Sequence, residues 1–439
     1  ETLDHTDAQQ LKSGQNIYGQ GMWAASLRYH EGRFYICFVA NDTRKTYLYT
    51  SEKIDGPWKK QLIEGFYHDG SLLFDEDGRN YIVYGNDELN EDLTAPKKDG
   101  LHRLLVSDHK NPELGYEGSH IQKINGYYYI FLVHSLRDRW MRTEACFYSD
   151  SLEGEFTGGD VLCDDRGYCG QGVAQGGIVD TPDGKWYAML FQDSGAVGRI
   201  PILLPVTWKD HFPVFGQNGH VPEEIEVHST RPGYIYQPLV GSDDFCNGLL
   251  PRWQFNHDPD PRYYHLDALQ GTYTITTREV CTELTQAVNT LTQRMSYPSC
   301  AAEVTVDASA LKEGDVAGLC VLQGCYAAVG ITKHHGKYEV LMLDKKEDGI
   351  LDMTEGTVVE SHQMDFRLEA DFCNMKDEAR CYYRVNKGDW LPIGTVHKLY
   401  FKLDHFTGCR FGLFCYAAEE TGGSACFRDF KYYDVDEIS

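Results

Sequence analysis

The chain has 439 residues, a formal net charge of −25 and an isoelectric point near 5.0. This charge disfavours nucleic acid, an anionic membrane or an acidic polysaccharide as a partner, so neutral glycans fit better, and no apolar run approaches the roughly 20 residues of a membrane helix. The length predicts two domains, and an aromatic content of 13% with 43 glycines indicates an all-β protein with many tight turns.

The fourteen cysteines are scattered and form no Cys-x-x-Cys pair, which argues against a zinc ribbon or a redox dithiol. Several, such as Cys37 and Cys146, stand among strand-like residues, as small hydrophobic side chains do. Disulfides are an open alternative. We favour reduced thiols and therefore expect a bacterial, cytoplasmic protein rather than a secreted one.

One phrase occurs four times between residues 14 and 222: a strand, a turn made of an acidic residue or asparagine followed by glycine, and an aromatic strand. Each copy is typical of a β-hairpin. The turn glycines Gly32, Gly78, Gly126 and Gly184 are 46, 48 and 58 residues apart, the repeat length of a β-propeller blade. The copies alone leave open a closed ring of four blades or a five-bladed ring whose first blade is missing from this chain.

Each copy has a candidate site residue nine positions before its glycine: Trp23, Asp69, Glu117 and Gln175. We expect these positions to be structurally equivalent and to face one channel, because the innermost strands of a propeller line its axis. Two carboxylates in such a channel push each other's pKa values apart, so that one donates a proton while the other holds charge. Glycoside hydrolysis requires such a pair.

Each of these residues also has a simpler interpretation. Asp69 precedes Gly-Ser, where an aspartate commonly bonds its own backbone. Glu117 has no such local role, so its matched position favours a functional pair. Trp23 could offer its face to a sugar ring or pack between blades, and Gln175 could bond sugar hydroxyls or belong to a tightly packed, glycine-rich strand.

Further candidates lie beside the predicted channel. Arg199 could bond a sugar hydroxyl and the carboxylate of the acid, or form a surface salt bridge. His120 could bind substrate or be a polar strand residue. No three-His, His-x-His or EF-hand spacing predicts a catalytic metal. A structural calcium ion is left open, with Asp244 and Asp429 as weak candidate ligands that are more simply explained as surface carboxylates.

The repeat disappears from Ser242 onward. Short alternating strands joined by polar turns follow, for example at 272–276, 302–306 and 382–385, a pattern typical of a β-sandwich. Pro232 and Pro238 stiffen the segment before it. We therefore predict a β-propeller over residues 1–228, a linker over 229–241 and a concanavalin-like β-sandwich over 242–439.

Several long phrases resemble glycoside hydrolase family 43, which includes β-xylosidases and α-L-arabinofuranosidases. In the first half these phrases are Phe66-Tyr-His-Asp-Gly-Ser-Leu-Leu-Phe, Glu117-Gly-Ser-His-Ile-Gln-Lys-Ile-Asn-Gly-Tyr-Tyr-Tyr, Gln175-Gly-Gly-Ile-Val-Asp-Thr-Pro-Asp-Gly-Lys-Trp-Tyr and Gly198-Arg-Ile-Pro-Ile-Leu-Leu-Pro-Val-Thr-Trp. Downstream, residues 251–259, 289–294 and 314–319 resemble the β-sandwich often fused to these enzymes.

The resemblance implies a five-bladed propeller, an inverting mechanism and no cofactor required for the chemistry. It assigns the general acid to Glu117, and the tuning of that acid and the orientation of substrate to Asp69. Arg199 matches a substrate-contacting arginine, and Trp23 an aromatic residue at the sugar subsite.

The family's general-base aspartate lies in an Asp-Pro phrase of the first blade, and nothing in this sequence matches it. Asp4 and Asp7 are followed by histidine and alanine, with no strand behind them. We therefore expect the first blade and the base to lie outside this chain, with a separate N-terminal fragment as one source.

We predict an inverting exo-glycosidase that removes α-L-arabinofuranosyl or β-D-xylosyl units from arabinoxylan, or from xylo- and arabino-oligosaccharides. The sequence does not rank one sugar above the other. The alternative is a propeller that binds carbohydrate without catalysis, because the base is not in the chain.

Overall fold

The computed structural model describes residues 4–84, 87–402 and 407–434. The chain divides into two compact units: Gln20–Asp193 with Arg199–Thr230, and Glu1–Gly19 with Ser194–Gly198 and Arg231–Ser439. Both consist mainly of antiparallel strands, which confirms the all-β prediction. Within the described residues, no helix has the length and apolar character needed to cross a membrane.

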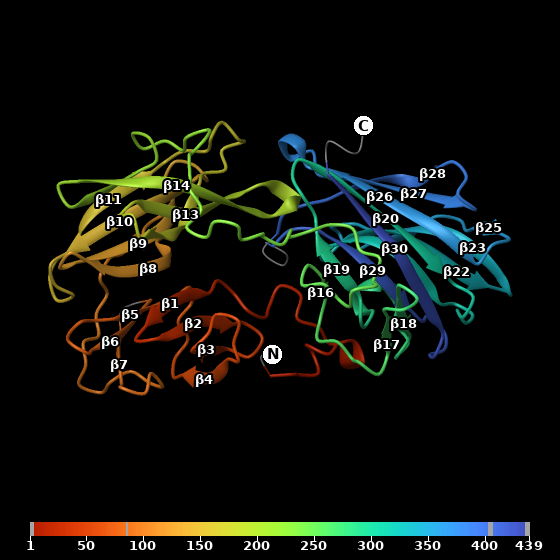
Figure 1. The fold of residues 1–439 in the computed structure, drawn as a ribbon, viewed down its shortest axis with the longest axis horizontal. Helices are drawn as coiled ribbons and strands as arrows, with labels where there is room; N and C mark the ends of the chain where they lie inside the picture. Colours follow the sequence, from red (N-terminus) through yellow and green to blue (C-terminus); the bar gives the residue numbers. More distant parts are fainter. Residues whose placement is uncertain (1–3, 85–86, 403–406, 435–439) are drawn as a thin grey trace. The chain divides into compact units, whose positions relative to one another are not determined.

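The first unit contains four small sheets, in each of which the strands pair in chain order (Figure 1). They are β1 (Ser26–His30), β2 (Arg33–Ala40), β3 (Lys45–Ser51) and β4 (Lys59–Ile63); β5 (Ser71–Phe74), β6 (Asn80–Val83) and β7 (Asp87–Leu89); β8 (Glu117–Ile124), β9 (Tyr127–Ser135), β10 (Arg142–Ser149) and β11 (Thr157–Leu162); and β12 (Ala174–Asp180), β13 (Trp186–Asp193), β14 (Arg199–Lys209) and β15 (Phe212–Phe215). The described residues thus form a propeller-like arrangement of four blades, one for each copy of the repeated phrase.

The first strand of each blade contacts the first strand of the next: β1 lies against β5, β5 against β8 and β8 against β12. Apolar side chains fill the spaces between neighbouring blades. Leu73 and Tyr81 of the second blade, for example, pack with Ile121 and Ile130 of the third. Packing of this kind fixes β8 between β5 and β12, and the residues at the starts of these strands are thereby brought together.

The hairpins at the four glycines are of two kinds. Glu31-Gly32 and Asn125-Gly126 form two-residue turns with positive φ at both positions, as in type I′ turns. The other two hairpins have five-residue loops, 75–79 and 181–185, between the closing pairs Phe74–Asn80 and Asp180–Trp186. Counting back from the glycine therefore does not lead to the same place in every blade.

The predicted equivalence of the four site positions is wrong by one residue, counted from the point where regular pairing of each inner strand begins. Trp23 and Glu117 lie three residues before the first regular cross-strand pair of their hairpins, at Ser26 and His120, whereas Asp69 and Gln175 lie two residues before theirs, at Ser71 and Gly177. The backbone agrees with this register. The equivalent positions in blades two, three and four all have left-handed φ values: Asp69 (51°), Gly118 (64°) and Gln175 (66°).

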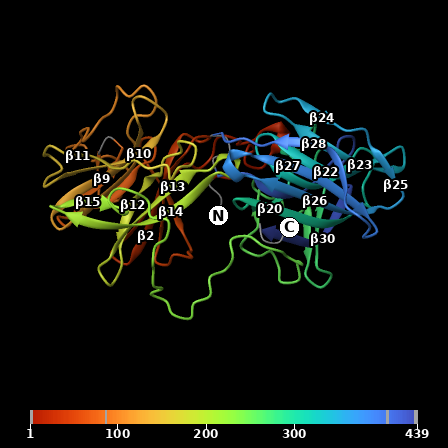
Figure 2. The same ribbon diagram turned by 90° about the horizontal axis from the view of Figure 1, so that it is seen from above.

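The second unit contains two larger sheets, whose neighbouring strands β20, β26 and β30 are visible in Figure 2. One sheet contains β16 (Gln254–Phe255), β19 (Leu291–Arg294), β29 (Arg410–Tyr416), β21 (Val316–Leu322), β22 (Tyr326–His334), β23 (Lys337–Lys345), β24 (Leu351–Met353) and β25 (Thr357–Val359). The other contains β17 (Tyr264–Asp267), β18 (Thr272–Thr276), β30 (Ser424–Asp434), β20 (Ser299–Asp307), β26 (Gln363–Asp371), β27 (Glu378–Val385) and β28 (Leu391–Lys398). Short 3₁₀ turns occur at Lys12–Gly14, Gly195–Val197, Leu284–Gln286 and Cys373–Met375. The predicted β-sandwich is confirmed.

The N-terminal stretch that lacks the repeated phrase belongs to this second unit. The Tyr18 hydroxyl donates a hydrogen bond to the carbonyl of Thr285 at 2.9 Å and accepts one from Asn256 at 2.6 Å. Arg278 donates to the carbonyl of Gln10 at 2.9 Å. All fourteen cysteines are described and none forms a disulfide, and many are buried as the small apolar residues that the sequence suggested.

Candidate active site

Glu117 is brought beside Asp69 by serine hydroxyls that join two blades. Asp69 lies just before β5, and Glu117 is the first residue of β8. The Ser119 hydroxyl donates to the backbone carbonyl of Asp69 at 3.1 Å, and Ser71 Oγ accepts the backbone N–H of Ile121 at 3.1 Å. These bonds hold the start of β8 against the start of β5, as the propeller prediction requires.

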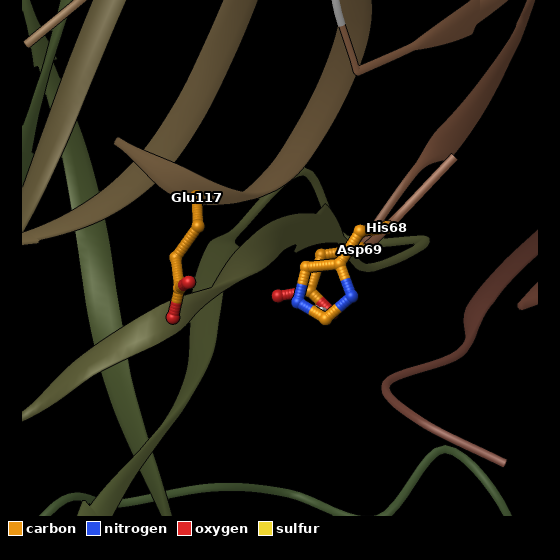
Figure 3. A group of neighbouring side chains, drawn as sticks. All are labelled: His68, Asp69 and Glu117. Carbon is orange, nitrogen blue, oxygen red and sulfur yellow. Dashed lines mark ion pairs between the residues drawn. The ribbon is translucent and has the colours of Figure 1, made fainter. Parts of the chain in front are cut away.

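Figure 3 shows the resulting arrangement: Glu117 hangs beside Asp69 and its neighbour His68. One ligand atom from each of the three side chains can be chosen so that all lie within 4.8 Å of one another. Asp69 is buried, and Glu117 is half-buried. The two predicted catalytic carboxylates therefore lie together, and His68 is a third member that the sequence analysis did not predict.

Gln175 reaches this cluster from β12 across Gly118. Its side-chain Oε1 accepts a hydrogen bond from Arg142 at 3.0 Å, and its Nε2 donates to Asp69 Oδ2 at 3.4 Å. A Cβ atom on Gly118 would lie 2.8 Å from Gln175 Cγ, so the glycine after the acid makes room for the amide. Both ends of the amide have protein partners, so the structure shows Gln175 supporting Asp69, and its contact with substrate stays a prediction.

Two arginines share the carboxylate of Asp193 at the end of β13. Arg142 Nε lies 3.3 Å from Asp193 Oδ2, and Arg199 Nε lies 3.2 Å from Oδ1. The guanidinium carbon of Arg199 also lies 4.4 Å from the centre of the Phe191 ring, and that of Arg142 lies 5.2 Å from it. Arg199 is thus held inside the site, which excludes the surface salt bridge as its explanation.

Burial and charge together keep a proton near the pair. Burial raises the pKa of Glu117 above its ordinary range, and the neighbouring Asp69 raises it further. Burial also raises the pKa of Asp69. His68, Arg199 and Arg142 oppose the increase at both carboxylates by favouring their charged forms. The charge of Asp69 is the added cause at Glu117, and it suits Glu117 to hold the proton of the pair.

Trp23 contacts the cluster through His68, since the centres of the two rings are 5.3 Å apart. His120 lies on β8, three residues after Glu117, and its neighbours are Gly177 of β12 and Arg28 of β1. Arg28 donates to the carbonyls of Leu72 and Ile121. Removal from water and the charge of Arg28 lower the pKa of His120 to about 3, so the imidazole is neutral at ordinary pH.

The sequence analysis missed His68, Arg142, Asp193 and Glu144. Arg142 and Glu144 lie on β10, the third strand of its blade, which carries no copy of the repeated phrase. Glu144 has no exposed surface, and its Oε2 accepts the backbone N–H of Gln175 at 2.7 Å. For Arg142 and Glu144 the available signal was two charged residues directly before the strand-like run 145–148, which is unusual in a buried strand.

A calcium ion at Asp244 and Asp429 stays a prediction, and Asp244 has a local hydrogen bond. Asp244 Oδ1 accepts the backbone N–H of Cys246 at 2.9 Å, a local turn bond. Among the described residues, the group of His, Cys, Asp and Glu side chains spaced to hold a metal is His68, Asp69 and Glu117.

Two family models match the chain, one on each side of its linker. Residues 2–213 match the model described as "Glycosyl hydrolases family 43", and residues 242–433 match "Beta xylosidase C-terminal Concanavalin A-like domain". The chain belongs to glycoside hydrolase family 43. The resemblance found in the sequence phrases is confirmed, as is the concanavalin-like character of the sandwich.

Known relatives of this family 43 chain differ in the activity that their names give. A putative β-xylosidase of Xylanibacter ruminicola is 28% identical over 72% of this chain and 61% of its own length. A non-reducing-end α-L-arabinofuranosidase of Bacteroides ovatus is 24% identical over 78% of this chain and 68% of its own. A solved structure described as a bifunctional GH43-CE protein of Bacteroides eggerthii is 40% identical, with a TM-score of 0.90, over 99% of this chain and 57% of that one. The chain thus spans about 60% of the length of the Xylanibacter and Bacteroides eggerthii proteins.

Proposed function

We propose that this family 43 chain is the catalytic part of an inverting exo-glycosidase that releases α-L-arabinofuranosyl or β-D-xylosyl units from arabinoxylan-derived substrates. The observation that carries the proposal is the position of Glu117, half-buried beside Asp69 and near two arginines, with its pKa raised. The names of the relatives support the substrate class but divide between the two sugars.

In the proposed step, Glu117 transfers its proton to the glycosidic oxygen. The bond between that oxygen and the anomeric carbon breaks, and its electron pair stays on the leaving oxygen. Water attacks the anomeric carbon from the opposite face and gives its proton to a base. One displacement inverts the configuration.

Asp69 is not the base in this proposal. An inverting pair of carboxyl groups stands about 6.5–9.5 Å apart and a retaining pair about 5–5.5 Å apart, whereas the chosen ligand atoms of Asp69 and Glu117 lie within 4.8 Å. Asp69 is close enough to tune the acid and too close to leave room for water. We place the base outside the four described blades, in a fifth blade as the family resemblance implies.

Hydrolysis of 4-nitrophenyl α-L-arabinofuranoside and β-D-xyloside by the complete polypeptide tests the proposal. We expect turnover of at least one glycoside, with the inverted anomer as the first product in a proton NMR time course. A retained anomer would refute the inverting mechanism. Sugar binding without turnover would support the alternative, a propeller that binds carbohydrate and does no chemistry.

A further inference from the structure

The three side chains in Figure 3 are also a ligand set for a metal ion. His68 and Asp69 come from the connection between β4 and β5, and Glu117 comes from the start of β8. Each can offer one ligand atom, and all three atoms lie within 4.8 Å of one another. Asp69 and Glu117 are 48 residues apart in the chain, so no local spacing in the sequence could reveal the set.

An independent observation indicates that a cation belongs there. Asp69 is only 8% exposed, and its Oδ1 is a buried oxygen with no hydrogen-bond donor. The nearest charged partner of Oδ1 is His68 Nε2, at 3.8 Å, which is too far for a hydrogen bond. A buried carboxylate oxygen without a partner is costly, and a metal ion between Asp69 and His68 would satisfy it.

The donor set selects the class of metal. One imidazole nitrogen and two carboxylate oxygens suit zinc and neighbouring transition metals, whereas calcium and magnesium prefer oxygen alone. Three protein ligands with an open fourth position are common for zinc, at about 2.0–2.2 Å from the ion.

Charge sets a limit on the affinity. A divalent cation neutralises the two carboxylates, but Arg142 and Arg199 lie near them and oppose a further positive charge. Asp193 offsets part of that opposition, since it pairs with both arginines. The balance favours an ion that binds reversibly over one that is held permanently.

We propose that one zinc-class divalent ion binds reversibly to His68, Asp69 and Glu117 and inhibits the enzyme. The ion occupies the carboxylate that otherwise donates the proton, so sugar hydrolysis and metal binding exclude each other. The inhibitory consequence rests on the proposed role of Glu117, whereas the binding itself does not.

Titration calorimetry with zinc chloride, on protein freed of metal by a chelator, tests the binding. We expect one zinc ion per chain. His68→Phe keeps an aromatic ring beside Trp23 but removes the nitrogen, and it should weaken zinc binding about 100-fold or more, because even residues that merely support a metal ligand cost 10–100-fold when lost. The matched control is His265→Phe, an exposed histidine on β17, which should leave the affinity unchanged.

A second variant keeps the proposal testable if His68→Phe folds poorly. Glu117→Gln removes one carboxylate and should also weaken zinc binding, with a melting curve as the check on folding. Zinc affinity that is unchanged in both folded variants would overturn the proposal, as would equal affinity for zinc and calcium. Because heat of binding is measured without substrate, a protein that binds zinc but hydrolyses no glycoside would refute the proposed function alone.

Discussion

At the scale of single residues, Glu144 shows how a group that never touches substrate can shape the site. It is fully buried on β10, and burial raises its pKa well above the ordinary range, which favours its neutral form. Its Oε2 fixes the backbone of Gln175, a non-glycine residue with φ of 66°, a conformation that costs roughly 1–2 kcal/mol. Gln175 in turn contacts Arg142 and Asp69.

We predict that Glu144→Leu lowers kcat/KM by about 10–100-fold, the size of loss that a displacement near 1 Å produces. Glu144→Gln keeps the shape and the acceptor oxygen and should restore most of the activity. The measurement is steady-state kinetics of both variants over a range of pH. If the two variants lose activity equally, the hydrogen bond to Gln175 is not what the site needs.

The coupling of Asp69 to Glu117 has a signature in pH dependence. The charge of Asp69 raises the pKa of Glu117, and a general acid is active only while protonated. Activity therefore falls as the pH rises through that pKa. We predict that Asp69→Asn, which removes the charge, lowers the pKa of Glu117 and moves the basic limb of the kcat/KM profile to lower pH. A limb that stays in place or moves to higher pH would contradict the coupling.

At the scale of the element, the second, third and fourth blades each have a left-handed residue two positions before regular pairing of the inner strand begins. In the third blade this residue is Gly118, directly after the acid, and in the second and fourth it is Asp69 and Gln175. The two non-glycine residues are the ones whose side chains meet, with Gln175 Nε2 3.4 Å from Asp69 Oδ2. Gly118 has no side chain and therefore leaves room for the contact between Gln175 and Asp69.

Gly118→Ala should therefore damage the site through contact as well as backbone strain. Its Cβ would lie 2.8 Å from Gln175 Cγ and 2.9 Å from Nε2. The matched control is Gly78→Ala, which also has positive φ (83°) but open space around the new Cβ. We predict that both variants lose some thermal stability and that only Gly118→Ala loses kcat/KM, by about tenfold or more. Equal kinetic effects would mean that backbone strain alone is responsible.

The blades and the catalytic pair could be predicted from the sequence, whereas the rest of the site could not, because a sequence pattern shows local structure and not which strands pack together. Strand alternation and the recurring phrase predict the blades, and the carboxylates in them predict Asp69 and Glu117 as a pair. The one-residue shift between hairpins was hidden because the sequence displays a glycine in every turn but not whether two or five residues close it. Arg142, Asp193 and Glu144 depend on which strands lie behind the inner ones, which only the packed structure shows.

At the scale of the whole molecule, the chain leaves one compact unit and returns to it between Asp193 and Arg199. Asp193 and Arg199 belong to the propeller unit, while the intervening Ser194–Gly198 is grouped with the sandwich unit. Within that second unit, the Ala196 carbonyl accepts the backbone N–H of Cys409 at 2.9 Å. The two residues of the buried ion pair are thus joined by a short segment with backbone partners of its own.

Gly408 is in tight contact with that segment, since a Cβ atom there would lie 1.9 Å from the carbonyl oxygen of Val197. We predict that Gly408→Ala displaces Ser194–Gly198 and lowers kcat/KM by about tenfold, because Arg199 follows directly in the chain. Gly349→Ala, with positive φ (82°) and open space, is the control in the same unit. Activity unchanged by Gly408→Ala would show that the site does not depend on the position of Ser194–Gly198.

The central claim is that Glu117 delivers the proton to the leaving group. The most direct test compares the activity that Glu117→Ala loses on a substrate with a poor leaving group and on one with a good leaving group. A xylo- or arabino-oligosaccharide has a poor leaving group that needs the proton, whereas a 2,4-dinitrophenyl glycoside does not. The account predicts a loss in kcat/KM of about 10²–10⁴-fold on the oligosaccharide and little loss on the dinitrophenyl glycoside. An equal loss on both substrates, or none on the oligosaccharide, would contradict it.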